Sequence, residues 1–208
     1  MRGPFLWERR YRLWSRKANM VVCMTSQLDP LNLFVAEMTK LLSVAQSEEL
    51  ILAEGKLLLG ALVSNDGWLP SECAKPLPGR YGQYLLYCDP QDRFSVVSLV
   101  WGPGQSTPVH DHTVWGLVGV LRGAERCDEF ELRDGQVHDL DDAHIMSPGQ
   151  VEAVSPTIGD WHRVSNASDG ASISIHVYGG NIGKIRRHRL DERGQIIDFV
   201  SGYENVAR

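Results

Sequence analysis

The chain has 208 residues, of which 43% are hydrophobic and 23% are charged, as expected for a globular protein of one domain. Its formal net charge of −5 argues against nucleic acid as the main partner. No segment approaches the roughly 20 consecutive apolar residues that cross a bilayer, so we expect no membrane partner either.

The N-terminal segment is basic but lacks the features of a signal peptide. Six arginine and lysine side chains stand against a single glutamate in the first 17 residues, and neither an apolar core nor a small-residue cleavage site follows them. We therefore expect residues 1–27 to form a solvated arm, and residues 28–208 to form one domain.

Residues 28–66 predict a helical segment. The composition is rich in Leu, Ala and Glu, and the spacing of apolar residues predicts helices over about 31–44 and 48–63. Ser47 followed by two glutamates is typical of an N-cap with an acidic first turn. Prolines and glycines then predict a loop before residue 80.

Residues 80–200 predict a β-barrel, because the hydrophobic period falls from 3.6 to 2. Short segments rich in β-branched and aromatic residues alternate with turn signals such as DPQD and SPGQ; the clearest are YGQYLLYC, FSVVSLVW, VWGLVGVL, DEFELR and SISIHVYG. Many strands at this spacing indicate an all-β sandwich or barrel.

The four cysteines indicate a reducing compartment. Cys23, Cys73, Cys88 and Cys127 are widely spaced and form no CxxC pair. In a chain of this size, that pattern is typical of free thiols rather than of a disulfide framework. We therefore expect a cytoplasmic protein.

His110 and His112 stand one residue apart in STPVHDHTVWG. In a strand, residues i and i+2 face the same side, so we expect the two imidazoles to point together and Asp111 to point away. Such a pair can bind one metal ion. Two surface histidines on an edge strand would produce the same isolated pattern.

Glycines and a third histidine extend this pattern. G-x5-H-x-H-x3-G-x6-G begins at Gly104, and GDWHRVSN surrounds His162. Together they resemble the two motifs of the cupin superfamily, which are jelly-roll β-barrels with a metal at the mouth. The resemblance covers approximately residues 80–180. It departs at Gly116, where most cupins carry a glutamate ligand.

Without that glutamate, three neutral imidazoles remain as metal ligands: His110, His112 and His162. Three protein ligands leave about three positions open on a six-coordinate ion, and no carboxylate offsets the charge of the ion. Such a site favours an anionic substrate bound directly to the metal, with room for O2 beside it. Zinc also accepts three histidines, so ligand type alone does not distinguish the metals.

Ser174, His176 and Tyr178 alternate along one strand with three apolar residues. If their side faces solvent, they form only a polar outer face. If it faces the barrel interior, they form a hydrogen-bonded row in which Ser174 fixes the tautomer of His176 and His176 orients Tyr178.

The histidines and this row together resemble the thiol dioxygenases of the cysteine dioxygenase family. The resemblance implies one non-haem Fe(II) per chain on the three histidines, beside a catalytic Ser174–His176–Tyr178 triad. It implies that both atoms of O2 are added to the sulfur of a small thiol carboxylate, giving a sulfinic acid. It also implies that Tyr178 hydrogen-bonds the bound oxygen or the substrate.

Two departures from the family pattern bear on its chemistry. In mammalian members, a cysteine near the position of Gly116 forms a thioether with the triad tyrosine, so we expect Tyr178 to be uncrosslinked here. Cysteine-specific members bind the substrate carboxylate with an arginine at a position that Gln83 occupies. With Gln at this position, the sequence resembles the bacterial branch of 3-mercaptopropionate dioxygenases. We therefore expect 3-mercaptopropionate to be the preferred substrate, with L-cysteine as the alternative.

The substrate carboxylate then needs another cation. GKIRRHR follows the triad strand and offers Arg186 and Arg187, of which we choose Arg187. Arg80 is a second candidate, three residues before Gln83. Alternatively, the GKIRRHR segment is a basic surface turn without a role in binding.

Two other classes stay open. One is a metal-binding cupin that senses a ligand without turnover, and the other is a zinc or manganese cupin hydrolase or isomerase. The aligned row argues against the sensor, because sensing needs no proton-handling groups. His138, His144 and His188 match no motif and are assigned no role.

Overall fold

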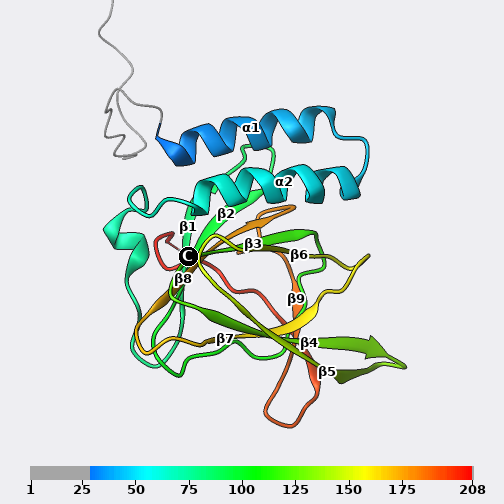
Figure 1. Cartoon of the computed structure of the whole chain (residues 1–208). Coiled ribbons are helices and arrows are strands. Elements are labelled where there is room, and N and C mark those ends of the chain that lie inside the picture. Colours follow the sequence, from blue (N-terminus) through cyan, green and yellow to red (C-terminus); the bar gives the residue numbers. More distant parts are fainter. Residues whose placement is uncertain (1–28, 208) are drawn as a thin grey trace, which may run out of the picture.

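Two helices precede the barrel in the computed structural model, which describes residues 29–207 (Figure 1). They are α1 (Pro30–Val44) and α2 (Glu48–Val63), close to the predicted ranges. Ser47 caps α2 as predicted, since its hydroxyl accepts a hydrogen bond from the Leu50 backbone N–H. None of the helices in this range is long and apolar enough to span a membrane. The predicted basic arm, residues 1–27, lies outside the described residues.

Antiparallel strands and the loops between them follow a short 3-10 helix, η1 (Ser71–Ala74). They are β1 (Gly82–Cys88), β2 (Ser95–Trp101), β3 (Gly116–Arg122), β4 (Glu125–Arg133), β5 (Gln136–Met146), β6 (Val151–Val154), β7 (Trp161–Asn166), β8 (Ser172–Tyr178), β9 (Arg187–Leu190) and β10 (Ile196–Phe199). The sheets have the orders β1-β2-β8-β3-β6, β5-β4-β7 and β10-β9. The predicted mainly-β fold with preceding helices is confirmed.

The helices cover the outer face of the five-stranded sheet, where α2 packs on β3 and β6 (Figure 1). This burial decides which way β8 faces. Its apolar residues, such as Ile175, join a core with Met38 and Leu59 on the helix side. Its alternate residues therefore face the barrel interior, where Tyr178 packs with Trp101. Both faces of β8 are buried, so its polar side chains are not a solvent-exposed surface.

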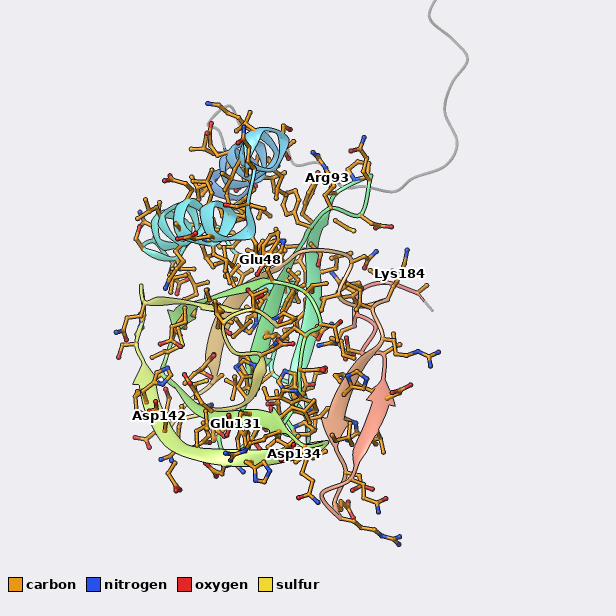
Figure 2. The ribbon with its side chains drawn as sticks, turned by 90° about the vertical axis from the view of Figure 1, so that its right-hand side faces the viewer. Glu48, Arg93, Glu131, Asp134, Asp142 and Lys184 are labelled. Atoms are coloured by element: carbon orange, nitrogen blue, oxygen red, sulfur yellow. The ribbon has the colours of Figure 1, made fainter. Side chains whose placement is uncertain are left out.

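Two parts of the sequence behave differently from the prediction. The segment of His110 and His112 is not a regular strand: it is irregular, with isolated bridges from His110 to His162 and Arg189. The predicted strand pattern is wrong there, although the two imidazoles still lie together. In addition, the segments of β5, β6, β7, β9 and β10 were not among the predicted strands. β5 carries many polar residues; Asp142 on β5 and Glu131 on β4 point outward (Figure 2).

Candidate metal centre

Three histidine rings converge inside the barrel. His110 and His112 come from the segment before β3, and His162 comes from β7. The centroids of the three rings lie 4.8–4.9 Å apart, and one nitrogen of each ring lies within 4.8 Å of the others. Two backbone hydrogen bonds of 3.0 Å join His110 to His162 and align the two segments.

A neighbouring group holds the Nδ1 atom of each ring. His110 Nδ1 donates to the Pro108 carbonyl (3.0 Å), and His112 Nδ1 donates to Asp160 (2.8 Å). His162 Nδ1 contacts the Cys127 sulfur at 3.6 Å. Since a ring that donates from Nδ1 keeps its lone pair on Nε2, these contacts leave Nε2 for a ligand.

The orphaned Nε2 of His112 tests whether a metal ion fits. This atom is fully buried and has no hydrogen-bond partner among the described residues. Buried nitrogens without partners are rare in folded proteins, and a bound ion is one explanation for them. Burial also lowers the pKa of all three imidazoles, that of His162 to about 4, so the rings are neutral, as metal binding requires. The donor set therefore fits a metal ion.

The polar residues of β8 form a hydrogen-bonded row beside these rings. Ser174 Oγ lies 2.7 Å from His176 Nε2, and His176 Nδ1 lies 2.8 Å from the Tyr178 hydroxyl. The Tyr178 ring stacks on His112, with centroids 5.3 Å apart and planes at 23°. Burial lowers the pKa of His176 and raises the pKa of Tyr178, so both groups are neutral. The row thus ends against a candidate metal ligand.

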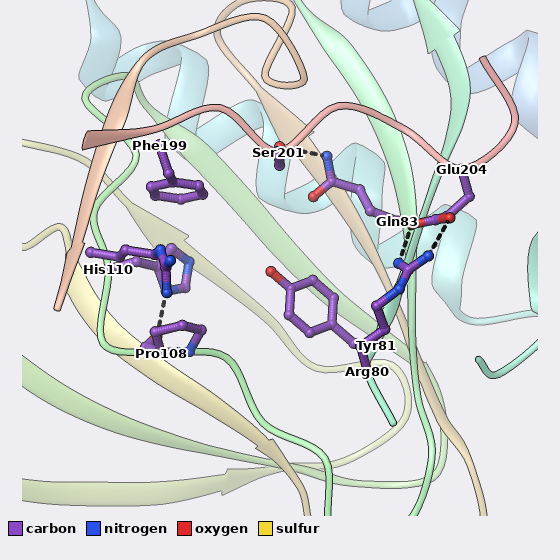
Figure 3. Close-up of a pocket in the computed structure, with 9 residues that line it drawn as sticks. Arg80, Tyr81, Gln83, Pro108, His110, Phe199, Ser201 and Glu204 are labelled. Atoms are coloured by element: carbon purple, nitrogen blue, oxygen red, sulfur yellow. Dashed lines mark hydrogen bonds and ion pairs between the residues drawn. The ribbon is translucent and has the colours of Figure 1, made fainter. Parts of the chain in front are cut away.

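A cavity of about 250 Å³ opens beside His110 (Figure 3). Gln83 and Tyr81 line it, together with Phe199 and Ser201 from the C-terminal segment. The Gln83 amide nitrogen donates to the Ser201 hydroxyl (2.9 Å) and to the Gly202 carbonyl (2.7 Å). Because a carbonyl can only accept, these bonds commit the amide nitrogen of Gln83 to the C-terminal segment.

The three candidate arginines have different environments. Arg80 pairs through both guanidinium nitrogens with Glu204, and exposed Arg186 pairs with Asp198 at 3.0 Å. Arg187 is 4% exposed and lies close enough to the histidines to lower their pKa. Of the three, Arg187 reaches the interior.

Arg187 is a buried cation that forms no ion pair with the described residues. Its guanidinium donates to the Ser201 hydroxyl (2.7 Å) and lies 4.5 Å from the centre of the Phe199 ring. Its Nε atom has no hydrogen-bond partner, and no carboxylate of the described chain forms an ion pair with it. Asp111 and Asp160 interact with the guanidinium electrostatically without reaching ion-pair distance, so Arg187 can still accept an anionic ligand.

Several contributing residues were missed by sequence reasoning. Asp160 binds His112 and stands two residues before His162, a spacing that could have drawn attention to it. Tyr81 and Ser201 carry no sequence signal. Asp111 points away from the imidazoles of His110 and His112, as expected, and its carboxylate accepts a hydrogen bond from His188 Nδ1 at 2.7 Å.

His144 belongs to a second group of possible metal ligands, with Cys127 and Glu152. Its Nε2 atom bonds the Glu152 carboxylate at 2.7 Å, and both of these side chains are about one-third exposed. This partnership already satisfies the ring, unlike the orphaned nitrogen of His112.

A family model for cysteine dioxygenase type I matches residues 74–193, more than half of the chain. The chain belongs to this family. Membership implies an oxidoreductase of the cysteine dioxygenase type with a non-haem metal, and His110, His112 and His162 could hold that metal.

Solved structures similar to this family member include cupin-like proteins. A double-stranded β-helix domain protein from Klebsiella pneumoniae is 18% identical over 56% of this chain and 93% of its own, with a TM-score of 0.45. A cupin-2 domain from Rhodospirillum rubrum is 14% identical over 58% of this chain and 72% of its own, with a TM-score of 0.43.

Proposed function

We propose that this protein is a non-haem Fe(II) thiol dioxygenase that converts a small thiol carboxylate and O2 into a sulfinic acid. The observation that carries the substrate class is Arg187, a buried guanidinium that forms no ion pair with any described residue and lies beside three convergent imidazoles. Leaving a buried charge unpaired costs several kcal/mol. A substrate carboxylate that contacts Arg187 would offset that cost and orient the substrate.

Different residues of the chain would hold the metal, position the carboxylate and supply a hydrogen bond. Iron held by His110, His112 and His162 would supply Lewis acidity toward the thiol sulfur and the redox chemistry that O2 requires. Arg187 positions the carboxylate, while the Tyr178 hydroxyl, held by His176, provides a hydrogen-bonding group next to His112.

We propose 3-mercaptopropionate as the preferred substrate, with L-cysteine as the alternative. Gln83 is uncharged, and its amide nitrogen is bound to Ser201 and Gly202. It therefore lacks the charge-assisted bidentate contact that an arginine would make with the carboxylate of cysteine. Arg187 and Gln83 both donate to the Ser201 hydroxyl, which lines the cavity, so a carboxylate bound by Arg187 would lie close to Gln83.

The test of the reaction is metal analysis of protein purified without added metal, followed by O2 uptake with a panel of thiols. We expect iron, O2 consumption with 3-mercaptopropionate and a sulfinic acid product. Replacing any of the three histidines by alanine should remove iron and activity together. Zinc or manganese without O2 uptake would indicate a hydrolase or isomerase, and ligand binding without turnover would indicate a sensor.

The substrate preference is tested by comparing kcat/KM for the two thiols. Hydrogen bonds to charged groups contribute about 1.5–3 kcal/mol, so moving the cation should change selectivity by about one to two decades. Gln83→Arg should narrow or invert the ratio, and Arg187→Ala should weaken both substrates. Arg186→Ala is the matched control and should change neither. A wild-type preference for L-cysteine would contradict the Gln83 argument but not the dioxygenase assignment.

We also propose that residues 28–208 act as one domain in the cytoplasm. The helices and the five-stranded sheet share one core, which supports the single domain. In the part of the chain that the structure describes, Cys73, Cys88 and Cys127 are free thiols, which supports a reducing compartment.

A further inference from the structure

A carboxyl group lies inside the barrel without a cation. Glu125 begins β4 and is 1% exposed. It forms no ion pair with any described residue, and neither carboxyl oxygen has a hydrogen-bond partner at ordinary geometry among the described residues. The hydroxyls of Ser172 and Ser174 nevertheless interact with it and lower its pKa. Glu125 therefore faces the end of the β8 row that lies farthest from His112.

We propose that Glu125 is the innermost, fourth member of the Ser174–His176–Tyr178 row, and that its carboxyl group donates a hydrogen bond to Ser174 that directs the protons of the row toward Tyr178. Glu125 is then a positioning residue, which acts through Ser174 and His176. The inference deepens the proposed function and depends on it only for the group that receives the Tyr178 hydrogen bond.

Burial favours the form of Glu125 that can donate a hydrogen bond to Ser174. An ionised carboxylate without a cation or aligned donors is costly inside a protein, so the neutral acid is favoured. Consistent with this, burial raises the pKa of Glu125 to about 8, although the two serines oppose the shift. A neutral carboxyl group carries one O–H donor, whereas an ionised one can only accept.

If the Glu125 carboxyl group donates, the donor and the acceptor of every other hydrogen bond in the row are determined. When Glu125 donates to Ser174 Oγ, the Ser174 hydroxyl donates to His176 Nε2. Nδ1 then carries the imidazole proton and donates to the Tyr178 oxygen. The proton of Tyr178 is left for the substrate or oxygen next to His112. If Glu125 accepted from Ser174 instead, every hydrogen bond of the row would reverse. The Tyr178 hydroxyl would then donate its proton to His176 Nδ1 and not to the substrate or oxygen.

The test is the tautomer of His176, read from its side-chain nitrogens by 15N NMR. The full-length chain is measured metal-free and with Zn2+ as a diamagnetic probe, and loss of signals in His176→Gln assigns the resonances. We expect the Nδ1–H tautomer in the wild type. Glu125→Gln should keep it, because an amide can also donate. Glu125→Leu should shift the population toward Nε2–H, and Glu131→Gln, half-exposed on the same strand, should have no effect.

Kinetics provide a second readout. We expect Glu125→Leu to lower kcat about 10- to 100-fold relative to the wild type, with little change in KM. The kcat of Glu125→Gln should stay within about threefold of the wild-type value. An Nε2–H tautomer in the wild type overturns the proposal even if Glu125→Leu fails to fold, and so does an unchanged tautomer in a folded Glu125→Leu protein. The NMR readout needs no thiol turnover, so it separates failure of this proposal from failure of the proposed function.

Discussion

At the scale of single residues, Asp160 shows how one carboxylate orients a candidate ligand. It accepts hydrogen bonds from the backbone N–H groups of His112 (3.0 Å) and Thr113 (2.9 Å), as well as from His112 Nδ1 (2.8 Å). Thr113 has φ of 60°, a conformation that is unfavourable for a β-branched residue and that these bonds help to hold. Asp160 therefore supports both the ring and the backbone that carries it.

We predict that Asp160→Asn weakens metal binding about 10- to 100-fold, because the amide cannot supply the same charge-assisted acceptor to His112. Titration against a competing chelator measures the affinity. Asp142→Asn on the exposed edge of β5 is the control and should bind like the wild type. Equal affinities of Asp160→Asn and wild type would show that the carboxylate has no role in holding His112.

Gly116 lies directly opposite Tyr178 in the pairing of β3 with β8. A Cβ atom at this position would lie 3.1 and 3.3 Å from two ring carbons of Tyr178, and 3.0 Å from Val154. A thiol placed here would therefore reach the ring. The glycine leaves that contact empty, which is the structural reason to expect an uncrosslinked tyrosine.

We predict an unmodified Tyr178 peptide in the wild type by mass spectrometry. In Gly116→Cys, turnover should produce a loss of two hydrogens, one from the thiol and one from the ring, with O2 as the oxidant. Gly116→Ser has nearly the same size without sulfur and should show no mass change. A modified Tyr178 in the wild type would contradict the placement of Gly116.

At the scale of elements, Asp89 holds the turn that joins β1 to β2. The Asp89 carboxylate accepts from the Arg93 guanidinium (2.7 and 2.9 Å) and from the backbone N–H of Gln91 (3.0 Å). Arg93, followed by these backbone donors, lowers the pKa of Asp89 from 3.8 to about 2. The depressed pKa means that the folded protein binds this proton more weakly than the unfolded chain does.

This contribution to stability is present above pH 3.8 and is lost as the pH falls through about 2. We predict that Asp89→Asn lowers the free energy of unfolding by about 1–2 kcal/mol at pH 7, after allowance for solvent screening of Arg93. The difference from wild type should shrink at pH 2. Urea unfolding at both pH values measures it, with Asp134→Asn in the β4–β5 turn as control. An equal loss at both pH values would contradict the ionic origin.

At the scale of the whole molecule, the candidate metal site joins parts of the chain that meet only after folding. His112 and His162 belong to segments 50 residues apart in the sequence. An ion that binds the folded state but not the unfolded chain stabilises the fold by mass action, by about 2.7 kcal/mol at 100 times Kd.

We predict that anaerobic addition of Fe(II) raises the Tm of the wild type but not that of the His112→Ala/His162→Ala double variant. His138→Ala on β5 should respond like the wild type, because His138 lies outside the cluster. Differential scanning calorimetry measures the change. A rise of equal size in the double variant would show that iron binds elsewhere.

The sequence by itself determined the helices, most of the larger strands, the three histidines and the alternation of Ser174, His176 and Tyr178. These follow from local periods and spacings, which neighbouring residues encode. The tertiary structure decided that β8 faces inward, because the helices cover its other face. It also decided that Arg187 is buried while Arg186 pairs with Asp198 at the surface, and that Glu125 meets Ser174. Burial and hydrogen-bond partners depend on contacts between distant segments, which no local pattern of residues specifies.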